Sequence, residues 1–232
     1  MPSASKSKSR DLLELAIGYG LILAALWTSD PAQTILFWIA WVWVIVATLL
    51  SRPSAANLGL RPANAARSAL VPLVALLISA LAVWIASALH TLHAFSFRMA
   101  LSWPFWAYIL WTFLQQFALQ DYFLLRVMRL VSNRPVAVLL AGILFAGAHL
   151  PNPLLTAATL IWGIVSCALF LRDRDLYSLG IAQGILGLCM AVTIPGTIHH
   201  EMRVGLGYLH WSPPTQQPIA APSSRVPPPM PH

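Results

Sequence analysis

Long apolar runs alternate with short polar breaks along most of the chain. The runs lie at residues 12–28, 33–50, 68–89, 103–131, 135–150, 154–171 and 177–195. Most of them have the roughly 17–25 residues that a helix needs to cross a bilayer. Several breaks contain Pro, which ends helices because it lacks an N–H donor. The pattern predicts an all-α fold, a polytopic transmembrane helix bundle of about seven spans.

The two ends of the chain differ from this pattern. Residues 1–10 are polar and basic, which favours a disordered cytoplasmic leader. A secretory signal peptide is the alternative, but the apolar run that follows is long and lacks a clear cleavage site, so an uncleaved first span is favoured. Residues 212–232 are Pro-rich without periodicity, which predicts a disordered tail. Residues 11–211 then form one transmembrane domain, in which residues 90–102 are interpreted as a connection with a short interfacial helix.

Composition and charge agree with a membrane protein. The chain is 58% hydrophobic and 9% charged, whereas a soluble domain carries about 25% charged residues. The net charge of +7 does not indicate a nucleic-acid partner, because the Lys and Arg residues stand at the ends of apolar runs and follow the positive-inside rule. They place the N-terminus in the cytoplasm, with the lipid bilayer as the expected partner. The chain has no N-x-S/T sequon, and we expect a bacterial inner membrane.

The fourth apolar run holds an unusual set of polar residues. Its segment 113–129 contains Gln115, Gln116, Gln120, Asp121, Arg126 and Arg129. Ionisable groups at such depth are expensive and normally face the bundle interior, so this segment is the default functional site. The alternative is structural: Asp121 and Arg126 act as internal glue, or Arg126 and Arg129 reach the cytoplasmic headgroups.

Asp121 is expected to find its partner on another span. Asp121 and Arg126 are five residues apart, about 140° around an α-helix, so a local pair would be strained. A rise of about 1.5 Å per residue places His149 and Gln183 at comparable depths in the fifth and seventh runs. A buried carboxylate–imidazole pair can activate a water as general base. We therefore expect Asp121 to meet His149 near the midplane.

Three short motifs follow one another on the fourth, fifth and seventh runs. They read DYFLLR at 121–126, FAGAH at 145–149 and QGILG at 183–187. In order and spacing they resemble the EExxxR, FxxxH and HxxxN or HxxxD motifs of the CPBP intramembrane proteases. That family includes type II CAAX prenyl endopeptidases and bacterial self-immunity proteins. The resemblance covers about residues 100–195.

The resemblance implies a catalytic site. By position, Asp121 stands for the first Glu, which activates a water, and Arg126 stands for the Arg of the same motif. His149 and Gln183 stand where the two His residues of the family hold the water and the oxyanion. The supporting residues would be Gln120, Tyr122, Phe145 and Asn152.

The chain departs from the family pattern in the first and third motifs. Asp121 is one methylene shorter than Glu, and Tyr122 replaces the second Glu. Gln183 replaces His and cannot carry a proton, and Gly187 replaces Asn. Two functions stay open: an intramembrane endopeptidase that cleaves a membrane-tethered peptide with a carboxylate-activated water, or a degenerate member that binds such a peptide without cleaving it. A small transporter is a third, because an intramembrane Asp and Arg also suit a proton or solute path.

One further polar cluster, at residues 199–203, follows the seventh run. It is expected either to fold back over the mouth of the site or to lie exposed at the membrane interface. His199 and His200 are adjacent and point in different directions on a helix, and the chain has no HExxH motif. We therefore expect no zinc and no other cofactor.

Overall fold

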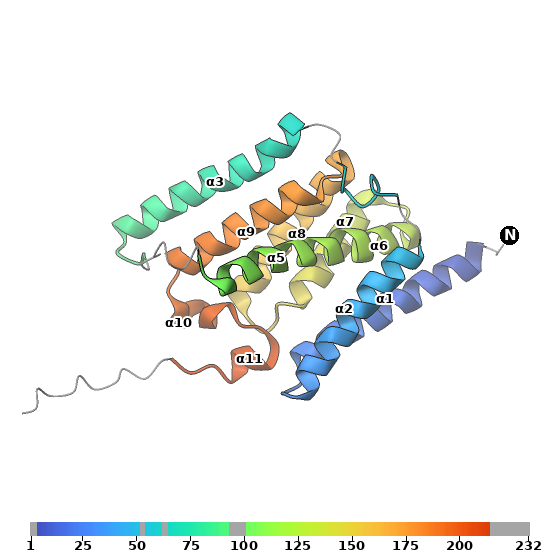
Figure 1. The fold of residues 1–232 in the computed structure, drawn as a ribbon, viewed down its shortest axis with the longest axis horizontal. Coiled ribbons are helices and arrows are strands. Elements are labelled where there is room, and N and C mark those ends of the chain that lie inside the picture. Colours follow the sequence, from blue (N-terminus) through green and yellow to red (C-terminus); the bar gives the residue numbers. More distant parts are fainter. Residues whose placement is uncertain (1–3, 52–53, 62–64, 93–100, 214–232) are drawn as a thin grey trace, which may run out of the picture.

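The computed structural model describes residues 4–51, 54–61, 65–92 and 101–213, and these residues form helices without any strand. The long helices are α1 (Ala4–Leu26), α2 (Ala32–Leu50), α3 (Ala65–Ala88), α5 (Trp103–Phe117), α7 (Arg134–Gly147), α8 (Pro153–Asp173) and α9 (Leu176–Thr193) (Figure 1). The shorter elements are the π-helix η1 (Ala118–Leu124), α6 (Leu125–Leu130), α10 (Gly196–His199), the 3-10 helix η2 (His200–Met202) and α11 (Gly205–Leu209). The predicted all-α class is thus confirmed.

Four helices in the described part of the chain are long and apolar enough to cross a membrane. They are Ala32–Leu50, Ala66–Ala88, Pro153–Asp173 and Leu176–Thr193. Helix α7 is a shorter apolar helix, and the run predicted over 103–131 is divided by the π-helix. The four helices support an integral membrane protein, whereas the count of about seven spans is not confirmed.

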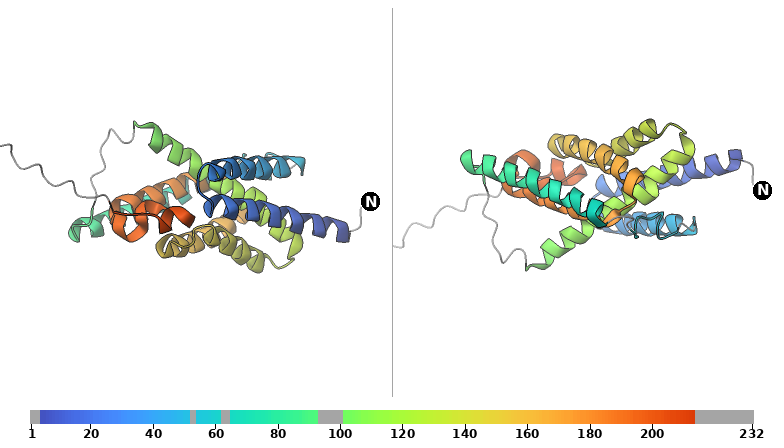
Figure 2. Two further views of the ribbon diagram at one scale, coloured as in Figure 1. Left: turned by 90° about the horizontal axis from the view of Figure 1, so that it is seen from below. Right: turned by 90° about the horizontal axis from the view of Figure 1, so that it is seen from above.

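The continuous path α5–η1–α6 runs through the middle of the bundle. Helices α1 and α2 pack against each other and against its η1–α6 half, and α7 and α8 form a second pair that also contacts η1. Helix α9 lies between α5 and α3 and contacts both. Figures 1 and 2 show α1 and α2 at one end of the molecule and α3 at the other. The η1 segment of the central path is therefore in contact with α2, α7 and α8.

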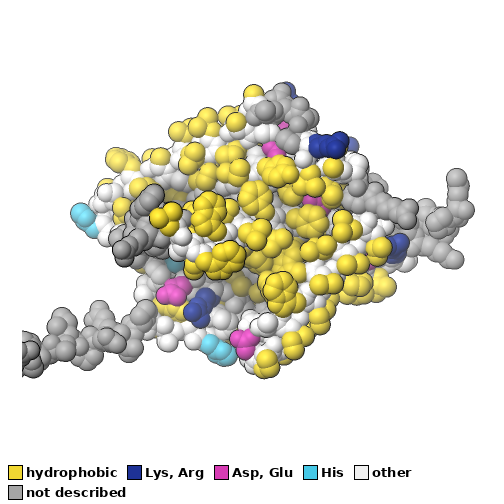
Figure 3. Space-filling view, viewed as in Figure 1, with side chains coloured by type: hydrophobic (Ala, Val, Ile, Leu, Met, Phe, Trp, Pro, Cys, Tyr) yellow, Lys and Arg dark blue, Asp and Glu magenta, His cyan; other side chains and the backbone are white. Residues whose placement is uncertain are grey.

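The outer face of the bundle is apolar. Large hydrophobic side chains of α3 are widely exposed, for example Leu77 at 62% and Trp84 at 69%. Figure 3 shows apolar side chains over most of one face, with charged and His side chains mainly toward its edges. A contiguous apolar surface of this kind suits lipid contact rather than water.

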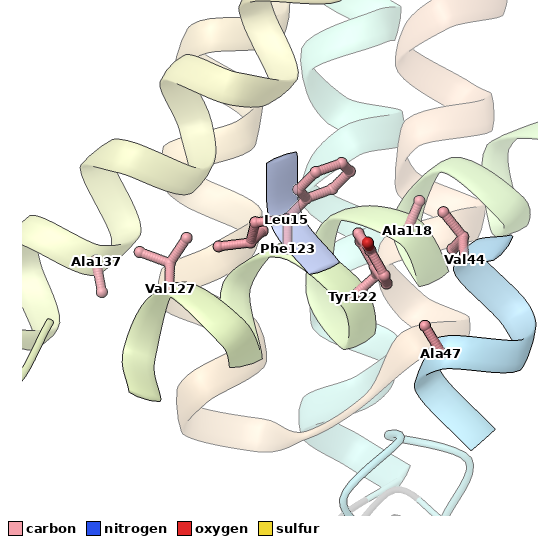
Figure 4. Close-up of a cluster of buried hydrophobic side chains, with 8 residues drawn as sticks. All are labelled: Leu15, Val44, Ala47, Ala118, Tyr122, Phe123, Val127 and Ala137. Atoms are coloured by element: carbon pink, nitrogen blue, oxygen red, sulfur yellow. The ribbon is translucent and has the colours of Figure 1, made fainter. Parts of the chain in front are cut away.

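The apolar core holds the π-helix in place. One buried cluster joins Leu15, Val44, Ala47, Ala118, Tyr122, Phe123, Val127 and Ala137, which come from α1, α2, η1, α6 and α7 (Figure 4). The side chains of η1 are all buried. Helices α1 and α2 thus pack directly on the segment that carries Asp121.

The ends of the chain can be compared with the sequence-based expectations only in part. Helix α1 begins at Ala4, so residues 4–10, which we expected to be a disordered leader, are helical. Residues 93–100 of the expected interfacial connection and residues 214–232 of the expected Pro-rich tail lie outside the described residues.

Candidate functional site

Asp121 lies in the middle of the π-helix. A π-helical turn is rare and is found frequently at functional sites. The Asp121 side chain is 2% exposed, and neither of its carboxylate oxygens is hydrogen-bonded to a described residue. A buried carboxylate without a partner is costly. This combination makes Asp121 the strongest candidate for chemistry among the residues that the structure describes.

Asp121 opens into a cavity of about 440 Å³. The cavity is lined by Thr48, Ser51, Asn57, Asp121, Leu125, Arg126, Met128, Arg129 and Arg174. Ser51 and Asn57 are exposed, whereas Asp121 is buried. The cavity therefore connects the end of α2 and the segment after it with the carboxylate, and it is large enough for several water molecules at about 30 Å³ each.

Two of the three cavity arginines are neutralised by acids of α1. Arg126 is 1% exposed, and its Nε and Nη2 lie 2.8 and 2.7 Å from the Glu14 carboxylate. Arg129 binds Asp11 through Nε and Nη2 at 2.7–3.0 Å. Arg126 therefore does not reach the headgroups, and its partner is Glu14 rather than Asp121.

Sequence reasoning missed these acids, although the sequence contains a signal for them. Asp11 and Glu14 are three residues apart, and so are Arg126 and Arg129. Residues three apart share a face of a helix. Two such faces match when α1 and α6 run antiparallel, so that residue 14 meets 126 and residue 11 meets 129.

The third arginine of the cavity, Arg174, has no acidic partner within 4.0 Å among the described residues. It caps α8 in the left-handed conformation, with φ at 47°. Its Nη1 donates to the Asn57 carbonyl at 3.2 Å, and its guanidinium carbon lies 5.1 Å from the centre of the Phe170 ring. Arg174 and Asp121, which have no ion pair within 4.0 Å among the described residues, thus line the same cavity.

Tyr122 supports Arg126 in the place where the family has a second Glu. Its hydroxyl donates to the Glu14 carbonyl and accepts a hydrogen bond of 2.7 Å from Trp43 Nε1. The Arg126 guanidinium carbon lies 4.0 Å from the centre of the Tyr122 ring, in a cation–π contact. Tyr122 therefore connects α1, α2 and the arginine.

Gln120 and Gln183 belong to a separate amide network between α5, η1, α8 and α9. Gln120 Nε2 donates to Gln116 Oε1 at 2.9 Å, and Gln116 Nε2 donates to Gln183 Oε1 at 2.5 Å. Gln183 Nε2 in turn donates to Gln115 Oε1 at 2.6 Å, and Trp162 Nε1 donates to Gln183 Oε1 at 3.1 Å. Neither Gln120 nor Gln183 lines the cavity of Asp121.

His149 is also engaged away from that cavity. Its Nδ1 lies 2.7 Å from the Phe145 carbonyl, and its ring packs edge to face on the Phe145 ring at 4.9 Å between centres. His149 does not line the cavity, and Asp121 has no hydrogen-bond partner. Asp121 and His149 thus form no direct hydrogen bond with each other, and their joint action on a water stays a prediction. The catalytic roles given to His149 and Gln183 stay predictions.

The side chain of Asn152 holds the segment after α9 in place, and Asn152 does not line the cavity of Asp121. Its Oδ1 accepts from the Leu155 amide at the start of α8, and its Nδ2 donates to the carbonyls of His199 and Arg203 at 2.8 and 3.0 Å. The 199–203 cluster thus folds back onto the turn after α7, although no residue of it lines the cavity. Among the described residues, no three His, Cys, Asp or Glu side chains could hold a metal ion together.

Comparison with known proteins places the chain in a family context. Residues 116–189 match the family model described as type II CAAX prenyl endopeptidase Rce1-like. This range holds all three motifs, from Asp121 to Gly187. No curated protein and no solved structure gives a significant match. The family match confirms the resemblance to the CPBP family and places an Rce1-like segment at residues 116–189 of this membrane protein.

Proposed function

We propose that the protein is an intramembrane endopeptidase of the CAAX-protease-like type, which hydrolyses a peptide bond in a membrane-tethered substrate. The observation that carries this proposal is Asp121: a buried carboxylate without a hydrogen-bond partner among the described residues, on the lining of a cavity that also includes exposed residues. The Rce1-like segment supports the same class of reaction. The cell membrane of a bacterium, with the N-terminus in the cytoplasm, is the proposed location.

Asp121 acts in this mechanism as the general base. Its carboxylate takes a proton from a water in the cavity, and the water oxygen forms a bond to the carbonyl carbon of the peptide. The C–N bond then breaks, and the proton passes from Asp121 to the leaving amine nitrogen. Arg126 braces the site, because its guanidinium is fixed by Glu14 and Tyr122 beside the cavity. No metal or organic cofactor takes part.

A second function is favoured by one specific observation. His149 and Gln183 are held by Phe145 and by the amide network, so the family's water-binding groups do not line the cavity. Such a protein could capture a membrane peptide in the cavity without cleaving it. The two functions differ in their requirement for the Asp121 carboxylate.

The test is cleavage in proteoliposomes. The substrates are lipidated peptides that carry a fluorophore and a quencher on either side of the candidate bond. Asp121→Asn should lower kcat by at least about 100-fold, the usual contribution of a general base. Asp30→Asn is the matched control, because Asp30 is exposed in the turn before α2. Undiminished cleavage by Asp121→Asn would refute the assignment, and peptide capture without cleavage by the wild type would favour the binding function.

His149→Ala tests the part of the family mechanism that the geometry does not support. If catalysis is confined to the cavity of Asp121, the variant should keep kcat, because His149 does not line that cavity. A loss comparable to that of Asp121→Asn would show that the imidazole reaches the reacting atoms, as the resemblance predicts.

A further inference from the structure

A second buried polar residue lines the cavity from outside the Rce1-like segment. Thr48 lies in the last turn of α2 and is 2% exposed. It lines the same cavity as Asp121. Its hydroxyl oxygen makes no hydrogen bond with any described residue. Two unpartnered buried polar side chains, one an acid and one a hydroxyl, therefore share one cavity.

The Thr48 hydroxyl does not bond within its own helix. A Ser or Thr inside a helix commonly donates its hydroxyl to a carbonyl three or four residues earlier. The hydroxyls of Ser51, Thr112, Thr159 and Thr193 do so at 2.6–3.1 Å. The Thr48 hydroxyl makes no hydrogen bond to a carbonyl of its own helix or to any other described residue. An unsatisfied buried hydroxyl costs free energy, which is recovered when a ligand in the cavity accepts the bond.

We propose that Thr48 is a catalytic residue, whose hydroxyl donates a hydrogen bond to the oxyanion that forms when the water attacks the peptide carbonyl. The inference rests on the proposed endopeptidase function and adds a group from α2 to it. The hydroxyl keeps its proton throughout the reaction. It therefore stabilises the negative charge of the oxyanion without taking part in the proton transfers. A donor placed in advance inside a poorly hydrated site stabilises developing charge far more than water does.

The amide of the third motif and the second hydroxyl of the cavity lining are engaged elsewhere. The family places an Asn where this chain has Gly187, which has no side chain. The Gln183 amide donates to Gln115, and Ser51 donates to the Ala47 carbonyl at 3.1 Å. The described lining of the cavity has two hydroxyl side chains, those of Thr48 and Ser51. Of these, the Thr48 hydroxyl is the one without a hydrogen bond.

The primary test compares three variants in the proteoliposome assay. Thr48→Val keeps the shape of the side chain without its donor and should lower kcat by about 100-fold with KM unchanged, as the loss of one oxyanion donor does. Thr48→Ser restores the hydroxyl and should recover most of the rate. Thr156→Val is the matched control: the Thr156 hydroxyl is also buried and unbonded, but the residue lies on α8 away from the cavity. This variant should keep the wild-type kcat.

A binding measurement separates this inference from the proposed function. A lipidated peptide with a phosphinate in place of the scissile amide imitates the tetrahedral oxyanion. Thr48→Val should weaken binding of the phosphinate by the same factor of about 100 and leave binding of the parent peptide unchanged. Cleavage that is lost in Asp121→Asn but kept in Thr48→Val would overturn the role of Thr48 alone. A wild type that cleaves no peptide would overturn the proposed endopeptidase function. If wild type and Thr48→Val then also bound the phosphinate equally well, the role of Thr48 as a hydrogen-bond donor would be overturned too.

Discussion

Removing the charge of Asp121 should stabilise the protein while it abolishes cleavage. The carboxylate is 2% exposed and has no hydrogen-bond partner among the described residues. An unsatisfied buried polar group costs about 1–3 kcal/mol, and a charged one costs more. Asp121→Asn keeps the shape without the charge, so we expect the free energy of unfolding to rise by about 1–3 kcal/mol. For a chain of this size that corresponds to roughly 2–10 °C in melting temperature.

Unfolding in one detergent provides the measurement. Cys167 is 0% exposed, so a thiol-reactive fluorophore that reacts with it on heating reports loss of the packed bundle. Asp30→Asn controls for the loss of an exposed acid and should leave the melting temperature unchanged. A melting temperature that falls in Asp121→Asn would mean that a partner holds the carboxylate in the folded protein. The carboxylate would then be structural, and the argument that it is free for chemistry would fail.

Four further changes test other parts of the site. Glu14→Gln should lower the free energy of unfolding by about 3–5 kcal/mol, because it leaves a buried guanidinium without its counter-ion. Asp11→Asn should cost under about 1 kcal/mol, since its arginine is 42% exposed; thermal unfolding compares the two. Arg174→Gln should raise KM for peptides that end in a carboxylate but not for their amides, because Arg174 is the arginine of the described cavity lining that has no acidic partner within 4.0 Å. Gly187→Asn restores a family residue and should lower the free energy of unfolding by about 1–3 kcal/mol, because its Cβ would overlap the Tyr108 hydroxyl. Adding Tyr108→Phe to the same chain should relieve this loss in the same unfolding assay.

The helices were predictable because apolar length and polar breaks depend on the sequence alone. The run predicted at 33–50 is helix Ala32–Leu50, and the run predicted at 177–195 is Leu176–Thr193. Asn133 and Asn152 sit at the breaks and accept hydrogen bonds from the first turns of α7 and α8. Such caps are local, so a single sequence reveals them.

The partners of the polar side chains were harder to predict, because depth does not determine direction. The rise per residue gave the heights of Asp121, His149 and Gln183 but not the way each one faces. The prediction also assumed α-helical rotation through Asp121, whereas residues 118–124 form a π-helix with more residues per turn. Its angle of about 140° between Asp121 and Arg126 therefore does not apply to this segment.

The residues at the third family motif and Asp121 lie in different surroundings in this structure. Gly187 lets the Tyr108 side chain of α5 pack directly on α9, and Gln183 closes the amide network between these helices. The positions of the third motif are thus packed against α5, and neither of them lines the cavity of Asp121. Asp121 and Thr48, two of the described residues whose buried oxygens make no hydrogen bond, lie instead on the lining of a cavity bounded by α2, α6 and the end of α8. Peptide hydrolysis by this protein would therefore take place on the α2 side of the π-helix, with a donor from α2 in the role that the family gives to α9.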